Sequence, residues 1–176
     1  MPEINQHGQT VNDIVPDWKC ARALTRTLLT GQYCRLEPLD ADRHSADLFE
    51  AYALGDDSDW TWLASTQPVS VEATAHWVLG KVLDDDLVPF AVIDLRTEKA
   101  VGLVSYMAIE RFQGSVEIGH VTWSRRMKGT RVGTEAVWLD MVYLPVYYRQ
   151  GVVVPAASPF RLEADGTVRI MSDDGK

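Results

Sequence analysis

The spacing of apolar residues changes several times along the chain, and each change predicts a new element. Residues 33–39 alternate apolar and polar side chains, a pattern typical of a short strand. Leu48, Phe49 and Tyr52 then recur at helical spacing after Asp40, a helix-capping residue type, and predict a helix over 42–54. The same patterns predict a helix, three strands and a final helix over residues 70–84, 89–95, 100–109, 115–124 and 131–143.

The three consecutive strands are joined by short connections, which favours an antiparallel meander inside an α+β domain. Helical spacing also predicts which side chains the two later helices bury. For the helix over 70–84 these are Ala75, Val78, Leu79 and Val82. For the helix over 131–143 they are Val132, Ala136, Leu139, Met141 and Val142.

The two ends of the chain differ from the middle. Residues 1–30 show no sustained period and are expected to form an N-terminal arm. The domain proper is expected over 31–144, followed by an atypical C-terminal tail over 145–176. In this tail we expect a strand at 151–155 and a hairpin at 160–170, because Asp165-Gly166 is a favourable hairpin turn. Prolines at 145, 155 and 159 disfavour a further helix.

Composition narrows the class of protein. The chain has 176 residues, 46% of them hydrophobic and 24% charged, as in an ordinary globular domain. Its net charge of -8 and the lack of a basic stripe argue against nucleic acid as a partner. The same acidity mildly favours cationic or amine-bearing partners.

Other features of the sequence favour a cytoplasmic protein that is not bound to a membrane. Cys20 and Cys34 lack the spacing of a zinc site or a disulfide framework, so we expect free thiols in a reducing compartment and no metal. Residues 1–13 lack the basic and then apolar profile of a signal peptide. No apolar run approaches the roughly 20 residues that a membrane span requires.

The strand over 115–124 leads into a basic loop containing glycine, and the loop opens a helix. Free N–H groups at a helix start form a site for an anion such as a pyrophosphate. Glycines allow the backbone to approach a ligand closely, and Lys128 and Arg131 could neutralise its charge. Loops of this kind also precede many helices that bind nothing.

Three stretches match one known family. They are residues 31–40 with 43–44 and 48–49, residues 101–106, and residues 117–124 continuing through 130–131 to 134–136. Together they resemble the GNAT N-acyltransferase superfamily, and within it the RimJ/RimL-like branch, over about 120 of the 176 residues. The resemblance implies a mixed, mostly antiparallel sheet flanked by helices, close to a three-layer α/β arrangement, that opens at the strand over 115–124.

The resemblance also implies that acetyl-CoA lies in this opening as the co-substrate. Its pantetheine arm would pair with the main chain at Val121, Thr122 and Trp123. Its pyrophosphate would lie on Lys128, Gly129, Thr130, Arg131, Val132, Gly133 and Thr134. The family's loop commonly has a glycine where this chain has Arg131, a departure that either weakens cofactor binding or adds a phosphate contact.

The implied chemistry is direct attack of a primary amine on the thioester, in a ternary complex. The amine must lose a proton, and the oxyanion needs a fixed donor such as a backbone N–H of the opened strand. Glu117 is the candidate general base through water, or else half of a cross-strand charge pair. His120 has a suitable pKa for the same role, or else is structural. Trp60 and Trp62 are candidates for the acceptor side, or pack in the core or at its rim.

Family members continue beyond the cofactor helix with a further strand, a helix and a strand pair, which commonly supply the group that protonates the thiolate. Residues 145–176 do not resemble that segment, as in a truncated or frame-shifted gene or a variant with an exchanged tail. Nothing recommends one nearby tyrosine over another as the acid. The function predicted is N-acetyl transfer to a protein N-terminus or a small-molecule amine. The alternatives are a non-catalytic acyl-CoA-binding remnant, or an interaction protein whose sheet edge pairs with a second copy as a homodimer.

Overall fold

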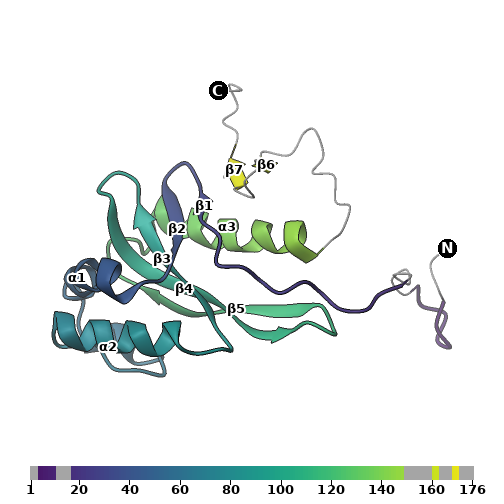
Figure 1. Cartoon of the computed structure of the whole chain (residues 1–176), viewed down its shortest axis with the longest axis horizontal. Coiled ribbons are helices and arrows are strands. Elements are labelled where there is room, and N and C mark those ends of the chain that lie inside the picture. The colour runs from purple at the N-terminus through teal and green to yellow at the C-terminus, as the bar shows by residue number, and fades with distance from the viewer. Residues whose placement is uncertain (1–3, 11–16, 149–159, 163–167, 171–176) are drawn as a thin grey trace.

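The order of helices and strands follows the apolar pattern of the sequence. The computed structural model describes residues 4–10, 17–148, 160–162 and 168–170 (Figure 1). Its elements are β1 (Leu29–Thr30), β2 (Cys34–Pro38), α1 (Ala41–Tyr52), η1 (Asp57–Trp60), α2 (Val71–Val82), β3 (Val88–Asp94), β4 (Lys99–Glu110), β5 (Ser115–Trp123), α3 (Arg131–Tyr148), β6 (Phe160–Leu162) and β7 (Val168–Ile170).

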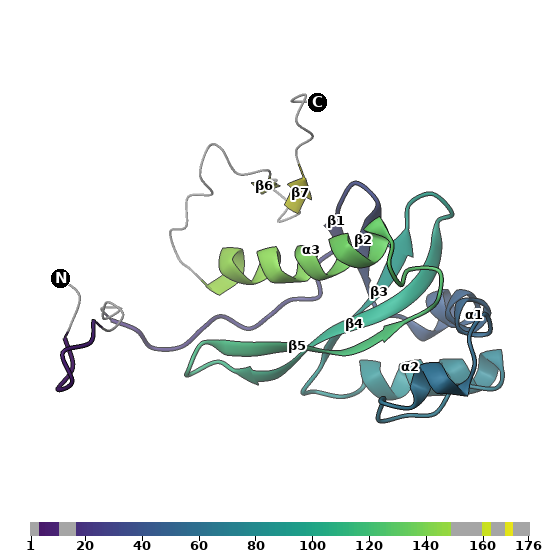
Figure 2. The same cartoon turned by 180° about the vertical axis from the view of Figure 1, so that it is seen from behind.

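The strands form one sheet in the order β5-β4-β3-β2-β1-β7-β6. All neighbouring strands are antiparallel except β1 and β7, which pair parallel. Helix α3 lies on one face of the sheet, and α1 and α2 lie on the other, so the domain has three layers (Figures 1 and 2). The predicted α+β class, a mixed and mostly antiparallel sheet flanked by helices, is confirmed.

Capping residues in the sequence explain where the first two long helices begin. The Asp40 side chain accepts a hydrogen bond from the backbone N–H of Arg43 at 2.9 Å and caps α1. The Ser70 hydroxyl accepts from the N–H of Ala73 at 3.1 Å and caps α2. These local bonds satisfy donors that the first helical turn leaves free, so both starts were predictable from sequence.

Each face of the sheet has its own hydrophobic core. The core under α3 includes Leu36, Phe90, Val104, Tyr106 and Leu139. The core under α1 and α2 contains a cluster of three aromatic rings, Tyr52, Trp60 and Trp77, packed edge to face with centroids 5.3 to 6.1 Å apart. Strand β3 is buried along its whole length because it lies between these two cores.

Some side chains differ from the pattern's prediction. Leu79 is 44% exposed and Met141 is 57% exposed, although both were expected to be buried. On α2 the buried residues are Thr74 and Val78, because α2 meets the aromatic cluster along a line rotated from the predicted one. Helix α3 continues through Pro145 to Tyr148, beyond its predicted end. Strands β6 and β7 pair as the predicted hairpin requires, whereas its turn and the strand expected at 151–155 lie outside the described residues.

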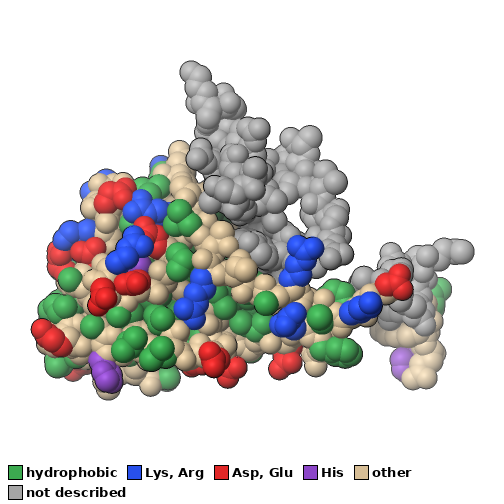
Figure 3. Space-filling model, viewed as in Figure 1, with side chains coloured by type: hydrophobic (Ala, Val, Ile, Leu, Met, Phe, Trp, Pro, Cys, Tyr) green, Lys and Arg blue, Asp and Glu red, His purple; other side chains and the backbone are tan. Residues whose placement is uncertain are grey.

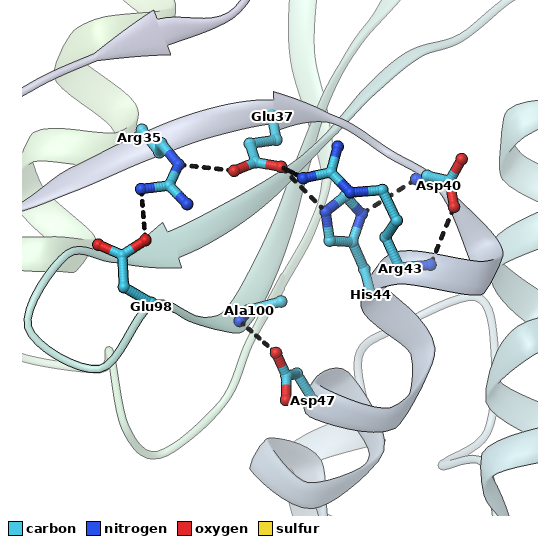
Figure 4. A network of polar contacts seen from close by, with 8 residues as sticks. All are labelled: Arg35, Glu37, Asp40, Arg43, His44, Asp47, Glu98 and Ala100. Carbon is cyan, nitrogen blue, oxygen red and sulfur yellow. Dashed lines mark hydrogen bonds and ion pairs between the residues drawn. The ribbon is translucent and has the colours of Figure 1, made fainter.

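A partly buried polar network joins β2 to α1 (Figure 4). Arg35 and Arg43 both donate to the Glu37 carboxylate, at 2.6 and 2.5 Å. His44 completes the cluster: its Nδ1 accepts from the N–H of Asp40 at 3.1 Å, so its Nε2–H faces Glu37 Oε2 at 3.4 Å. Acidic and basic side chains intermingle on the surface at this end of the molecule (Figure 3).

Candidate functional site

Strand β5 contains a β-bulge where the candidate site lies. Gly119 lies opposite Ser105, and Thr122 lies opposite Leu103, so β5 has one extra residue between these two pairs. His120, in the bulge, has φ 48°, a conformation that few residues other than glycine adopt. Bulges re-aim side chains and occur beside active sites, and strain of this kind persists where the surrounding structure imposes it.

Helix α1 holds the bulged strand through one buried hydrogen bond. The hydroxyl of Tyr52 donates to the backbone oxygen of Thr122 at 3.1 Å. A pocket of about 220 Å³ lies beside this bond, lined by Trp60, Val121 and Lys128 among others. Trp60 is 7% exposed and belongs mainly to the aromatic cluster, so only part of it reaches the pocket.

The loop after β5 turns sharply into α3. Thr130 caps the helix, since its hydroxyl accepts from the N–H of Gly133 at 3.4 Å. A side chain at Gly133 would meet the Met127 backbone oxygen at 2.6 Å, so only glycine permits this close approach. The backbone N–H groups of Gly129, Arg131 and Val132 have no hydrogen-bond acceptor within the described part of the chain. These donors at a helix N-terminus are suited to an anion.

The cations of this loop already have partners. Lys128 Nζ lies 2.7 Å from Asp59 Oδ1, and Arg125 bridges Asp59 and Asp56 at 2.9 and 2.8 Å. The hydrogen bond from Lys128 lowers the pKa of Asp59 below its usual range. Arg131 donates to the Tyr33 hydroxyl at 3.2 Å and lies over that ring. The α1–α2 connection is thereby linked by charge to the loop that precedes α3.

A second, mainly apolar pocket adjoins the same helix start. Its volume is about 390 Å³, and it is lined by Trp123, Gly129, Thr130, Gly133, Thr134, Val137, Trp138 and Met141. The indole N–H of Trp123 is buried and has no acceptor among the described residues. Val132, also at the helix start, packs instead against the core under α3. Trp123 lines both this pocket and the first one, and together the two pockets are lined by all the predicted cofactor residues except Arg131 and Val132.

A third pocket, which we call the α2–β5 groove, lies between α2 and the bulge. Its volume is about 500 Å³, and its walls include Trp62, Trp77, Lys81, His120 and Thr122. Trp62 is 94% exposed at the groove's edge. Lys81 Nζ lies 2.8 Å from His120 Nδ1 and 4.9 Å from the centroid of the Trp77 ring.

The two candidate bases lie three residues apart on β5. Both His120 and Glu117 are exposed, and Glu117 pairs with Met107 across the sheet. Partial burial lowers the pKa of His120, the nearby Lys81 charge lowers it further, and Asp84 and Glu117 act in the opposite direction. His120 is therefore mostly neutral at neutral pH.

Two polar residues of the site were not singled out in the sequence. Asp59 reaches Lys128 across 69 positions of the chain, a separation that no local pattern reveals. Lys81 left a weak signal: it follows Thr74 and Trp77 at helical spacing on the inward side of α2, where a lysine is unexpected.

Within the described ranges, no group of three or more metal-ligating side chains comes together. None of the described helices is long and apolar enough to cross a membrane.

Comparison with known proteins agrees with this geometry. A model of the acetyltransferase (GNAT) domain family matches residues 34–147. No curated protein matches the chain. The structure is similar to that of a GCN5-related N-acetyltransferase from Brucella melitensis, with 33% identity and a TM-score of 0.72 over 77% of this chain and 62% of that one.

Two further structures are similar. A GNAT-family acetyltransferase from Chromobacterium violaceum has 31% identity and a TM-score of 0.70, over 79% of this chain and 70% of that one. The GNAT-family acetyltransferase from Bacillus anthracis has 15% identity and a TM-score of 0.53, over 68% and 67%, and shows the fold alone. This chain thus spans less than two thirds of the length of the Brucella protein. Since the family model matches well over half of the sequence, the chain belongs to the GNAT acetyltransferase family.

Proposed function

We propose that this chain transfers an acetyl group from acetyl-CoA to a primary amine, which attacks the thioester directly in a ternary complex. The observation that carries the proposal is the β5 bulge, which has the donor-rich start of α3 on one side and the α2–β5 groove on the other. One reactant can bind on each side of a single strand. The acceptor is a small-molecule amine or a peptide N-terminus, as in the RimJ/RimL-like branch in which we place the chain.

The free backbone N–H groups at the start of α3 support a cofactor-binding site there. The N–H groups of Gly129, Arg131 and Val132 suit the pyrophosphate, with Lys128 and Arg131 supplying positive charge. The pantetheine arm would run along Val121, Thr122 and Trp123. Gly133 and Thr134 lie at the same helix start, beside the apolar pocket.

Residues of β5 carry out the proposed chemistry. Glu117 accepts the amine proton through water, since its exposed carboxylate is three residues from the bulge. A backbone N–H near Val121 stabilises the oxyanion. His120 lines the groove and contacts the acceptor. Trp62 covers one side of the acceptor in the α2–β5 groove. Trp60 lines the neighbouring pocket of about 220 Å³.

A second candidate function is acyl-CoA binding without turnover. The observation in its favour is that Lys128 is paired with Asp59 and Arg131 contacts Tyr33, so both loop cations must exchange partners to meet a pyrophosphate. Under this alternative, cofactor binding is weak and no amine is acetylated.

Calorimetric titration with acetyl-CoA tests the proposal. We expect micromolar binding that Arg131→Glu abolishes and Arg96→Glu, a charge-matched change at an exposed turn, leaves intact. Glu117→Gln should retain binding and lose turnover, followed as release of free CoA thiol with a panel of amines. A folded chain that does not bind acetyl-CoA would refute both functions, whereas binding without turnover of any amine would favour the second.

A further inference from the structure

We propose that Lys81 and His120 form an anion-binding pair in the α2–β5 groove, so that the amine accepted there also carries a carboxylate. The role of this amine as acetyl acceptor rests on the proposed function. The binding site itself does not, because it can be tested without acetyl-CoA.

The pair is built by two separate elements. Lys81 comes from the last turn of α2, and His120 comes from the bulge of β5. Lys81 Nζ and His120 Nδ1 are 2.8 Å apart, and Trp77 supports the ammonium with its ring at 4.9 Å. The left-handed backbone of His120, with φ 48°, lies in the bulge that holds its ring beside Lys81.

The contact also settles where the protons lie. An ammonium can only donate, so Nδ1 of His120 must be the acceptor and the ring proton must lie on Nε2. Burial lowers the pKa of both Lys81 and His120. If the His120 ring were also protonated, its positive charge would lie in contact with the Lys81 ammonium. The pair thus carries one positive charge and offers two kinds of donor, the Lys81 ammonium and the His120 Nε2–H.

The surrounding acidic groups do not neutralise this charge by contact. Asp84, which follows α2, lines the same groove and its charge acts on both Lys81 and His120, whereas the charge of Glu117, on β5, acts on His120. Among the described residues, neither forms an ion pair with Lys81, whereas Lys99 and Lys128 each do with a carboxylate. The half-buried Lys81 ammonium contacts the His120 and Trp77 rings, and among the described residues no carboxylate pairs with it.

The rest of the groove defines the shape of the ligand. Trp62, Leu63, Trp77 and Leu87 form an apolar and aromatic part of its walls. Thr122, at the strand where acetyl transfer is proposed, lies in the same groove as Lys81. One small molecule in a space of about 500 Å³ can therefore place an amine at β5 and a carboxylate at the Lys81–His120 pair. An amino acid with an apolar side chain has this combination of groups.

The experiment compares two ligands that differ only in the acidic group. L-phenylalanine and L-phenylalaninamide are each titrated by calorimetry into the full chain, without acetyl-CoA. We expect phenylalanine to bind about tenfold more tightly, the size of a hydrogen bond to a charged group. Lys81→Met should remove this preference, and Lys81→Arg should retain most of it. Lys19→Met is the control, because Lys19 is an exposed lysine of the N-terminal segment that does not line the groove.

Nitrogen-15 NMR of the histidine rings provides a readout that does not need a ligand. In the native chain His120 should have its proton on Nε2 and titrate below the usual histidine range. In Lys81→Met its pKa should rise and the tautomer preference should disappear. Equal affinity for both ligands, or an unchanged His120 tautomer in Lys81→Met, would overturn the proposal. If phenylalanine binds selectively but is not acetylated, the proposed anion site is supported and the proposed acetyl transfer to this ligand is refuted.

Discussion

Each face of the sheet buries an acidic side chain, and the two carboxyl groups differ in their hydrogen-bond partners. Glu37, under α1, accepts from Arg35, Arg43 and His44. Asp140, on α3, is fully buried, and neither of its carboxylate oxygens has a hydrogen-bond partner in the described chain. The Tyr106 hydroxyl donates instead to the backbone oxygen of Asp140, at 2.8 Å.

The difference teaches that burial alone does not set the charge of a carboxyl group. Burial raises the pKa of Glu37, but the hydrogen bonds from Arg35 and His44 outweigh it and leave the pKa below its usual value. Burial raises the pKa of Asp140 from 3.8 to about 7. Glu37 therefore stabilises the fold at neutral pH and loses this contribution in acid. Asp140 has the opposite pH dependence: the fold is less stable above about pH 7, where this buried carboxyl group ionises, than in acid.

The largest effect should come from Asp140→Asn. A raised folded-state pKa means that stability is lost as pH rises from about 4 to about 7, by about 4 kcal/mol in all. The amide cannot ionise, so the variant should be more stable than the native chain by up to about that amount at pH 8. Urea denaturation at several pH values measures it. The gain should shrink by about 1.4 kcal/mol per pH unit below 7.

Asp85→Asn, at an exposed turn, should change stability by no more than about 0.5 kcal/mol at any of these pH values. A loss of stability in Asp140→Asn at pH 8 would show that the native carboxylate is paired, and the comparison of the two faces would fail.

Glu135→Ala should have the next largest effect, on the same helix as Asp140. The Glu135 carboxylate accepts from three backbone N–H groups, those of Gln32, Tyr33 and Cys34, at 2.6 to 2.8 Å. Removing it leaves these donors without an acceptor and should cost about 3 kcal/mol. Glu135→Gln retains one oxygen and should cost about half as much. Equal losses in the two variants, by urea denaturation, would mean that charge matters more than the number of bonds.

Glu37→Gln should cost about 2 kcal/mol at pH 7, since the amide accepts the arginine bonds less strongly. Because the pKa of Glu37 is lowered, this cost should diminish as the pH falls below the usual glutamate range, opposite in sign to Asp140. Thermal unfolding at pH 7 and in acid measures both. Glu98→Gln is the control and should cost little, because the Glu98 side chain pairs with Arg35 and is 60% exposed. A cost that persists in acid would contradict a charged Glu37.

Asp59→Asn should have the smallest effect, and it acts on ligand affinity. Asp59 holds Lys128 at the surface, so neutralising it frees the cation for the pyrophosphate. Acetyl-CoA affinity should rise about two- to fivefold, as expected for an exposed ion pair. Asp57→Asn changes a neighbouring exposed aspartate in η1 and is the matched control. Weaker binding in Asp59→Asn would instead show that Asp59 orients Lys128 towards the cofactor.

Local features of the sequence were sufficient for the elements and for the family. The strand alternation, the caps Asp40 and Ser70, and the helical spacing depend on neighbouring residues, so a single stretch contains them. The glycine at 133 and the threonine at 130 act within one turn, and they too were readable. Helix α3 nevertheless continues past Pro145, although proline removes one helical hydrogen bond and disfavours a helix interior.

Only the tertiary structure decided which charged groups meet. Lys128 pairs with Asp59 and Lys81 contacts His120, and each of these contacts joins residues far apart in the chain. Asp140 is buried, and neither of its carboxylate oxygens has a hydrogen-bond partner among the described residues. The spacing of residues states which side of an element faces inward, but not which side chain of another element lies opposite. Contacts of this kind, and the pKa shifts they cause, follow from packing in three dimensions, which determines burial and the distance between charges.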